Sequence, residues 1–167
     1  MVGPAGRGRD TVAMANPDDP AALAAAFSRA HYFVPALGDA GRLHVGTQAS
    51  ALEEQLQGAR YAFITAWNAD SERDAQVDNQ RADGELTAEL DALGVSRLRA
   101  HAEDGQGGHR EDGWLVRDLP LAALDRLARH FGQDGVLAWS TGEPVRLRLY
   151  RAEPADAAGL LWVDWVG

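Results

Sequence analysis

The chain has 167 residues, a length typical of one domain, and 46% of them are hydrophobic, which is enough to form a buried core. It contains no cysteine, so disulfides, thiolate–metal sites and cysteine nucleophiles are excluded, and a reducing cytoplasm is the expected compartment. The net charge of -9 opposes binding to nucleic acid and to anionic lipid, because both present phosphate groups. No apolar run approaches the roughly 20 residues needed to span a bilayer. We therefore expect the protein to bind neither nucleic acid nor a membrane.

Composition divides the chain into three parts. Residues 1–16 are rich in glycine, proline and charge and lack the continuous apolar core of a secretory signal, so we expect a disordered tail. Residues 17–150 are expected to form a single α+β domain. Residues 151–167 read as a linker followed by the apolar segment LLWVDWVG. Two interpretations of that segment stay open: an added edge strand on the protein's own sheet, or a partner surface that forms a homodimer.

Two helices are predicted before residue 60. Asp19 and Pro20 are typical of an N-cap and of the first position in a helix. A second, short helix is expected to begin with a capping box formed by Ser50 and Glu53. Gly58 is expected to end it, because glycine readily adopts the left-handed conformation found after helices.

Residues 61–67 alternate as a strand does. One face carries Tyr61, Phe63, Thr65 and Trp67, and the other carries Ala62, Ile64 and Ala66. The small side chains of the second face allow a helix to pack closely. A long helix is predicted over residues 74–93, ended by Gly94. Its apolar stripe consists of Ala82, Leu86, Leu90 and Leu93.

The remaining elements complete a mixed fold. We expect short strands at 31–36 and 42–46, strands at 95–101, 113–119, 136–140 and 145–150, a helix at 120–132, and a polar, glycine-rich loop at 102–112. From residue 61 the order is strand, helix, strand, strand, helix, strand, which predicts an α+β fold with a ferredoxin-like βαββαβ core. Extra strands and an N-terminal helix would extend this mainly antiparallel sheet. A doubly wound parallel sheet is less favoured, because two of the links between strands lack a helix.

Polar side chains mark the end of the strand at residues 61–67. The strand runs directly into Trp67 and Asn68, and Asn79 extends the apolar stripe of the next helix. Burying an amide without a partner costs about 1–3 kcal/mol, so Asn79 needs a hydrogen-bonding partner. Either the two asparagines brace the turn between strand and helix, or they line a polar pocket. Gln133, directly after the helix stop at Gly132, allows the same two interpretations.

Two other polar groups favour structural interpretations. Side chains able to bind metals occur at His101, Glu103, Asp104, His109, Glu111 and Asp112. Their spacing matches no metal motif, so we expect a solvated loop, no metal and no cofactor. The predicted strands also carry Arg97, Arg99, Arg117, Arg146 and Arg148. We expect these arginines to pair with acids, and a face that stacks nucleobases on Tyr61, Phe63 and Trp67 is the weaker interpretation.

Three stretches together resemble a known bacterial family. They are YAFITAWNAD, DNQRADGELTAELDALG and REDGWLVRDLPLAALDRLARHFGQDGVLAW, and they fall in the order found in the family called domain of unknown function 3293. The resemblance extends from about residue 31 to residue 150. It implies a site list made of Thr65, Trp67, Asn68, Asn79, Glu111 and Gln133. Ala69 stands where the family tends to have proline, and the serine that usually accompanies the family's glutamate is missing from EDGW.

The family has no established activity, so the resemblance supports a fold and a site rather than a reaction. One hypothesis is a small polar or nucleotide-like ligand at the end of the central sheet. Trp67 would stack on it, the amides would bind its polar edges, and Glu111 would be the acid/base group of any reaction. The alternative is a non-enzymatic adaptor or regulatory module that binds through the sheet face or the LLWVDWV segment.

Overall fold

The structure, a computed structural model, describes residues 19–67, 73–105 and 109–167. The predicted tail, residues 1–16, lies outside this range. The α-helices are α1 (Pro20–Arg29), α2 (Ser50–Leu56), α3 (Arg73–Leu93) and α4 (Leu121–His130), with 3₁₀ helices η2 (Pro35–Gly41) and η3 (Ala157–Gly159). The strands are β1 (His31–Phe33), β2 (Arg42–Leu43), β3 (Arg60–Thr65), β4 (Arg97–Glu103), β5 (Arg110–Arg117), β6 (Gly135–Ser140), β7 (Leu147–Leu149) and β8 (Val163–Trp165).

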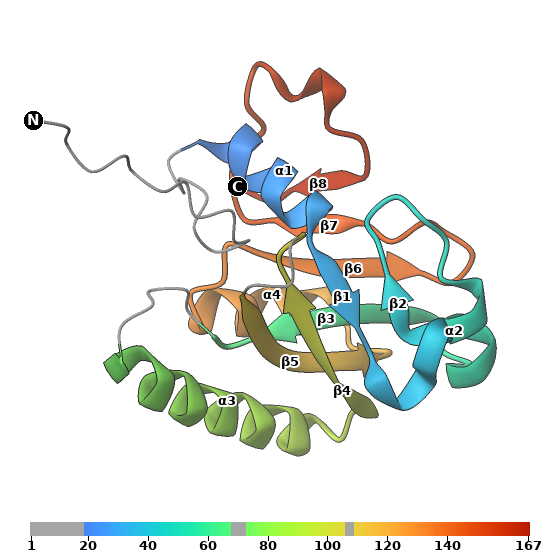
Figure 1. The fold of residues 1–167 in the computed structure, drawn as a ribbon, viewed down its shortest axis with the longest axis vertical. Helices are drawn as coiled ribbons and strands as arrows, with labels where there is room; N and C mark the ends of the chain where they lie inside the picture. Colours follow the sequence, from blue (N-terminus) through green and yellow to red (C-terminus); the bar gives the residue numbers. More distant parts are fainter. Residues whose placement is uncertain (1–18, 68–72, 106–108) are drawn as a thin grey trace, which may run out of the picture.

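The strands form an eight-stranded sheet in the order β2-β1-β4-β5-β3-β6-β7-β8 (Figure 1). Every neighbouring pair is antiparallel except β7 and β8, which are parallel. The prediction of an α+β fold with a mainly antiparallel sheet is therefore confirmed. The doubly wound parallel alternative is wrong for the described strands, because their central pairs run in opposite directions.

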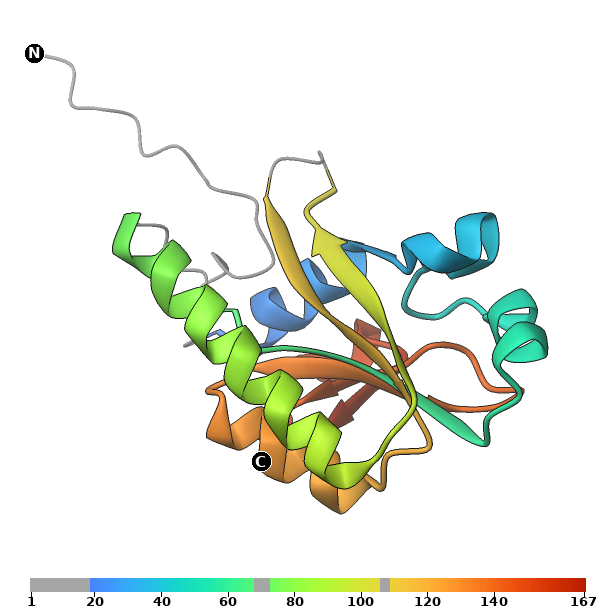
Figure 2. The ribbon, with the colours of Figure 1, turned by 90° about the horizontal axis from the view of Figure 1, so that it is seen from below.

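The alternation of β3 sorts its side chains into two cores. Ala62, Ile64 and Ala66 are buried in a cluster with Leu86 of α3 and Leu127 of α4. Tyr61 and Phe63 project to the opposite face, into a cluster that includes side chains of α1 and α2. Figure 2 shows this layering, with α3 and α4 on one side of β3 and β6 and α1 on the other. The alanines of β3 allow the helices to approach closely, as the sequence predicts.

Several helix boundaries agree with the predicted signals. The Asp19 carboxylate caps α1 by accepting a hydrogen bond from the Ala22 backbone N–H at 3.2 Å. Gly94 follows α3 and Gly132 follows α4, each with φ of +66°. Leu86 and Leu90 of the α3 stripe are fully buried, but Leu93 is 40% exposed, so the buried part of the stripe ends before the last residue of the helix.

The predicted capping box of α2 is wrong. The N-cap is Ala49, which makes no side-chain capping hydrogen bond, and the left-handed residue after the helix is Gln57, not Gly58. The Glu53 carboxylate instead accepts hydrogen bonds from Trp139 Nε1 at 3.2 Å and from the Gly142 backbone N–H at 2.7 Å. The buried indole N–H of Trp139 and the backbone N–H of Gly142, in the turn after β6, lie 86 and 89 residues away and compete successfully for this carboxylate.

The segment predicted as a loop at residues 102–112 is strand at both of its ends. β4 extends through Glu103 and β5 begins at Arg110, so His101 pairs with Asp112 and Glu103 pairs with Arg110 across the ladder. Pairing with β1 on the other edge of β4 supports the extension, since Phe33 lies opposite His101. The prediction of a loop is wrong for residues 102–103 and 110–112, because cross-strand contacts override their polar composition.

The C-terminal segment adds β8 to the sheet beside β7. Leu147 N donates to the Trp162 carbonyl oxygen at 2.8 Å, and Val166 N donates to the Leu149 carbonyl oxygen at 2.8 Å. The segment is thus an edge strand of the protein's own sheet. In the described part of the chain, no helix has both the length and the apolar character needed to cross a membrane.

Candidate functional site

Thr65 ends the central strand β3 with its side chain buried at 5% exposure. Its hydroxyl donates to the Asp112 carbonyl oxygen at 2.6 Å and accepts from the Trp67 backbone N–H at 3.0 Å. Opposite it on β5 stands Gly113, where a Cβ would collide with the Ile64 carbonyl oxygen. The threonine and the glycine therefore fix the path along which the chain leaves the sheet at Trp67.

Gln133 ties the end of α4 to the same point. Its side-chain amide donates to the Trp67 carbonyl oxygen at 3.2 Å and to the Phe131 carbonyl oxygen at 3.4 Å. Its backbone N–H donates to the Ala128 carbonyl oxygen at 2.8 Å, which closes the helix. The amide thus connects the helix end with the strand end. This is the bracing role that the sequence allowed as one of two interpretations.

Glu111 lies near the start of β5, two residues before Gly113, so its side chain projects from the same face as that of Thr65. It is 6% exposed, and its Oε1 atom has no hydrogen-bond partner among the described residues. His109 Nε2 lies 3.9 Å from that oxygen, which is beyond hydrogen-bonding distance. The candidate acid is therefore buried with a free acceptor.

Burial raises the pKa of the Glu111 carboxyl to about 7, and the negative charge of Asp134 contributes in the same direction. A carboxyl with that pKa is partly protonated at neutral pH, so it can both accept and donate a proton. Asp134 is itself held by Arg151, with 2.5 Å between its Oδ1 and an arginine nitrogen. Burial raises the pKa of the Tyr32 phenol, and the charge of Glu111 raises it further. Tyr32 therefore borders the same region.

The structure brings together part of the predicted list. Thr65, Trp67 and Gln133 are linked by hydrogen bonds, and Glu111 projects from the adjacent end of β5. Asn79 is buried at 9% exposure on α3, and α3 packs against the face of β3 opposite to the Thr65 side chain. Asn68 lies outside the described residues. Asn79 thus occupies a different layer from Glu111.

Sequence reasoning missed three neighbours of Glu111. Asp134 directly follows Gln133 after the helix stop, so its position at the end of α4 was a usable signal. His109 was assigned to a solvated loop, but it immediately precedes β5. Tyr32 belongs to β1, and β1 reaches this region only by pairing with β4, for which the sequence contains no local signal.

The other polar groups singled out in the sequence are the possible metal ligands and the strand arginines. Within residues 19–67, 73–105 and 109–167, no group of three or more metal-ligating side chains is placed to hold an ion. Four of the five strand arginines form ion pairs with acids, namely Arg97 with Asp91, Arg99 with Asp83, Arg146 with Asp164 and Arg148 with Asp125. Arg117 instead donates to the Leu56 carbonyl oxygen and to Ser96. Tyr61 and Phe63 are buried, so they offer no stacking surface to nucleobases.

Comparison with known proteins supports the resemblance. Residues 64–136 match a family described as "Protein of unknown function (DUF3293)". The matched segment begins within β3, ends within β6, and includes α3, α4 and all of the predicted site residues. The curated proteins and the solved structures yielded no match. Residues 64–136 are therefore similar to the DUF3293 family, as the resemblance predicts.

Proposed function

We propose that the protein binds a small polar ligand at the end of its central sheet, and that Glu111 contacts this ligand directly. The observation that carries the proposal is the buried Oε1 atom of Glu111, which has no hydrogen-bond partner among the described residues. Leaving a buried acceptor unpaired costs about 1–3 kcal/mol. Such unpaired groups, when they also have a perturbed pKa, are concentrated at functional sites.

The chemistry of the carboxyl limits the ligand class. A free carboxyl oxygen binds a ligand N–H or O–H group, and with a pKa of about 7 the carboxyl also donates when protonated. The negative charges of Asp134 and Glu111 disfavour an anion at this position. A neutral or cationic group that contains N–H or O–H, such as an amine, an amide or a nucleobase edge, fits best. The indole of Trp67, half-buried at the strand end, would stack on a planar ligand.

Proton transfer is the reaction type that this site would support. A general base or acid is most effective with a pKa near the working pH, and the carboxyl of Glu111 meets that condition. Thr65 and Gln133 would hold the surrounding backbone in place without contacting the reacting atoms, since their polar groups already bind the chain. The lack of cysteine is consistent with action in a reducing cytoplasm.

We also infer that the core is ferredoxin-like. Its strands occur in the sheet in the order β4-β5-β3-β6, and α3 and α4 both pack on one face. Both features support the split βαβ arrangement.

The test is a thermal-shift screen of nucleosides, amino acids and amines at pH 7. We compare the wild type with Glu111→Gln and with Glu54→Gln, which changes an exposed carboxylate on α2. A ligand at 100 times its Kd stabilises the folded state by about 2.7 kcal/mol, which corresponds to a shift of roughly 5–10 °C. We expect at least one compound that stabilises the wild type and Glu54→Gln but does not stabilise Glu111→Gln. A ligand that binds Glu111→Gln as well as it binds the wild type would refute the proposal.

A second candidate is the adaptor function, supported by the C-terminal edge. Leu161 and Trp162 are 69% and 39% exposed, and β8 pairs with β7 on one side only within the described chain. An exposed edge strand is a template for pairing with a further strand. Analytical ultracentrifugation of the wild type and of Leu161→Glu tests this alternative. A concentration-dependent dimer that the substitution dissociates would favour it, and two monomers of equal mass would exclude self-association through this edge.

A further inference from the structure

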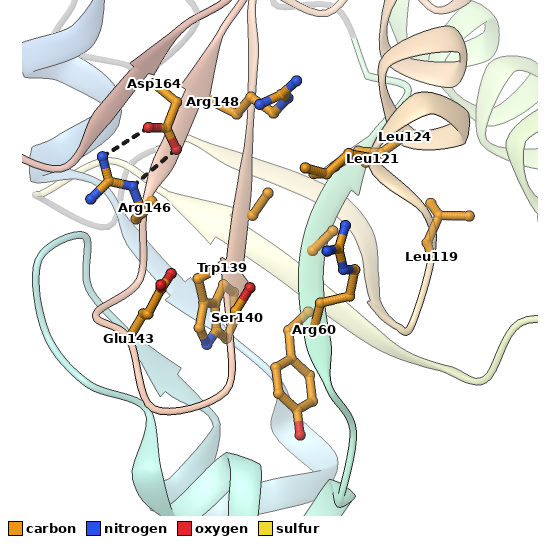
Figure 3. A pocket seen from close by; sticks show the side chains of 13 residues that line it. Arg60, Leu119, Leu121, Leu124, Trp139, Ser140, Glu143, Arg146, Arg148 and Asp164 are labelled. Carbon is orange, nitrogen blue, oxygen red and sulfur yellow. Dashed lines mark hydrogen bonds and ion pairs between the residues drawn. The ribbon is translucent and has the colours of Figure 1, made fainter.

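A pocket lies on the face of the sheet opposite to Glu111, over β3, β6 and β7 and beside α4 (Figure 3). Its volume is about 170 Å³. Ala62 of β3 and Ala138 of β6 contribute to its lining, and their small side chains leave space above the strands. This pocket shares no lining residue with the environment of Glu111, so it is a separate site.

One wall of the pocket is apolar. It is formed by Leu119, Leu121 and Leu124, which precede and begin α4. Leu119 and Leu124 are buried, but Leu121 is 37% exposed, so part of this wall is open to solvent. A ligand with a short hydrocarbon tail would cover Leu121 and remove that apolar surface from water.

The opposite wall is charged, but its charges are already paired. The Arg146 guanidinium binds both oxygens of Asp164, at 3.0 and 2.8 Å, as the dashed lines in Figure 3 show. The Arg148 guanidinium binds both oxygens of Asp125 in the same way, at 2.7 and 2.8 Å. Both guanidinium groups are therefore occupied by carboxylates of the protein, so neither arginine is free to bind a ligand carboxylate.

Arg60 differs from the other two arginines. It lines the pocket on the side of Leu121 and Leu124 (Figure 3), and among the described residues its guanidinium makes no ion pair or hydrogen bond, although backbone hydrogen bonds and, to a lesser extent, its charge lower the pKa of Asp118. Its backbone is held firmly, because the N–H donates to Asp118 Oδ1 at 3.1 Å and the carbonyl oxygen accepts from the Asp118 N–H at 2.9 Å. The Ser140 hydroxyl lies on the neighbouring strand at the position directly opposite Arg60.

We propose that this pocket binds a small organic monocarboxylate with a short apolar tail. The carboxylate would form a bidentate pair with the Arg60 fork and accept a hydrogen bond from the Ser140 hydroxyl. The tail would lie on Leu121 and Leu124, above the two alanines. The volume is below the roughly 300–1,000 Å³ of pockets for drug-sized ligands, so a nucleotide does not fit. Glu143 also lines the pocket, and its negative charge disfavours phosphates and dicarboxylates more strongly than a monocarboxylate.

Isothermal titration calorimetry of the full chain with hexanoate tests the proposal. The comparison ligands are acetate, which lacks the tail, hexan-1-ol, which lacks the charge, and inorganic phosphate, which lacks the tail and replaces the carboxylate with a more highly charged group. We expect hexanoate to bind, and each comparison ligand to bind at least about tenfold more weakly. Acetate or phosphate binding as tightly as hexanoate would overturn the assignment, and so would a failure of hexanoate to bind at millimolar concentrations.

Two substitutions locate the binding. Arg60→Gln removes the free fork, and Arg126→Gln removes the same charge from an exposed position of α4 outside the pocket. We expect Arg60→Gln to weaken hexanoate binding about tenfold or more and Arg126→Gln to change it less than twofold. Equal effects of the two variants would indicate non-specific charge attraction and refute the site. Glu111→Gln should bind hexanoate like the wild type, so this result is independent of the first proposal.

Discussion

The side-chain amide of Gln133 donates a hydrogen bond to the backbone carbonyl oxygen of Trp67 at 3.2 Å, across 66 residues of sequence. This bond joins the end of α4 to the end of β3, and the Thr65 hydroxyl fixes the same strand end from within. The geometry separates two roles that the sequence could not distinguish. Gln133 and Thr65 brace the strand end, whereas Glu111 beside them keeps an acceptor free.

Replacing Gln133 tests the bracing role. Gln133→Ala removes the donor to the Trp67 carbonyl oxygen, so we expect the free energy of unfolding to fall by about 1 kcal/mol. Urea unfolding followed by circular dichroism measures the change. The matched control is Gln80→Ala at an exposed position of α3, which we expect to stay within about 0.5 kcal/mol of the wild type. Equal effects of the two substitutions would contradict a brace.

Thr65→Val keeps the shape of the side chain and removes its hydroxyl. The buried Asp112 carbonyl oxygen and the Trp67 N–H each lose a partner, so we expect a loss of about 1–3 kcal/mol. Thr87→Val on α3 is the control, because the Thr87 hydroxyl donates only to the Asp83 carbonyl oxygen one helical turn away. Urea unfolding should rank Thr65→Val as clearly more destabilising than the control, and the reverse order would refute the role of the hydroxyl.

The raised pKa of Glu111 predicts a dependence of stability on pH. The pKa is about 7 in the folded state, above the ordinary value of about 4.5 for a glutamate, so the folded state holds the proton more tightly and loses stability as pH rises through this window. The loss reaches about 3 kcal/mol above pH 7. Glu111→Gln cannot lose a proton, so it should lack this term and be more stable than the wild type at pH 8.

Urea unfolding at pH 4, 6 and 8 measures that difference. Glu111→Gln and the wild type should differ least at pH 4, where the wild-type carboxyl is protonated in both states. Glu54→Gln should follow the wild-type curve throughout, since that carboxylate is exposed. Parallel curves for Glu111→Gln and the wild type would show that burial does not perturb this group.

The two residues of the predicted capping box should respond differently to substitution. Ser50→Ala should change the free energy of unfolding by less than about 0.5 kcal/mol, because Ser50 is exposed and caps nothing. Glu53→Ala leaves the indole N–H of Trp139 and the N–H of Gly142 without their acceptor, so we expect a loss of about 1–3 kcal/mol. Thermal or urea unfolding measures the loss of stability in each variant. Equal losses in Ser50→Ala and Glu53→Ala would support a capping box instead.

Local signals predicted much of the fold. The alternation in residues 61–67, the apolar stripe at Leu86 and Leu90, and the glycines that follow α3 and α4 depend on neighbours within a few residues, and the structure confirms each. Local signals gave wrong predictions where residues distant in the sequence bound the same side chain or paired with the same segment. Glu53 binds groups of β6 rather than its own helix start, and the polar segment before Gly113 is held as strand by its neighbours in the sheet.

The sequence by itself determined the element order, the two faces of β3 and the family similarity of residues 64–136, because short-range periodicity and motif order carry that information. Only the tertiary structure decided which of the described polar side chains have hydrogen-bond or ion-pair partners and which have none. Whether Thr65 and Gln133 are satisfied, and whether Glu111 and Arg60 are not, depends on strand pairing and on contacts across the chain. Burial and distance decide how a polar side chain acts, and neither is encoded in its immediate neighbours.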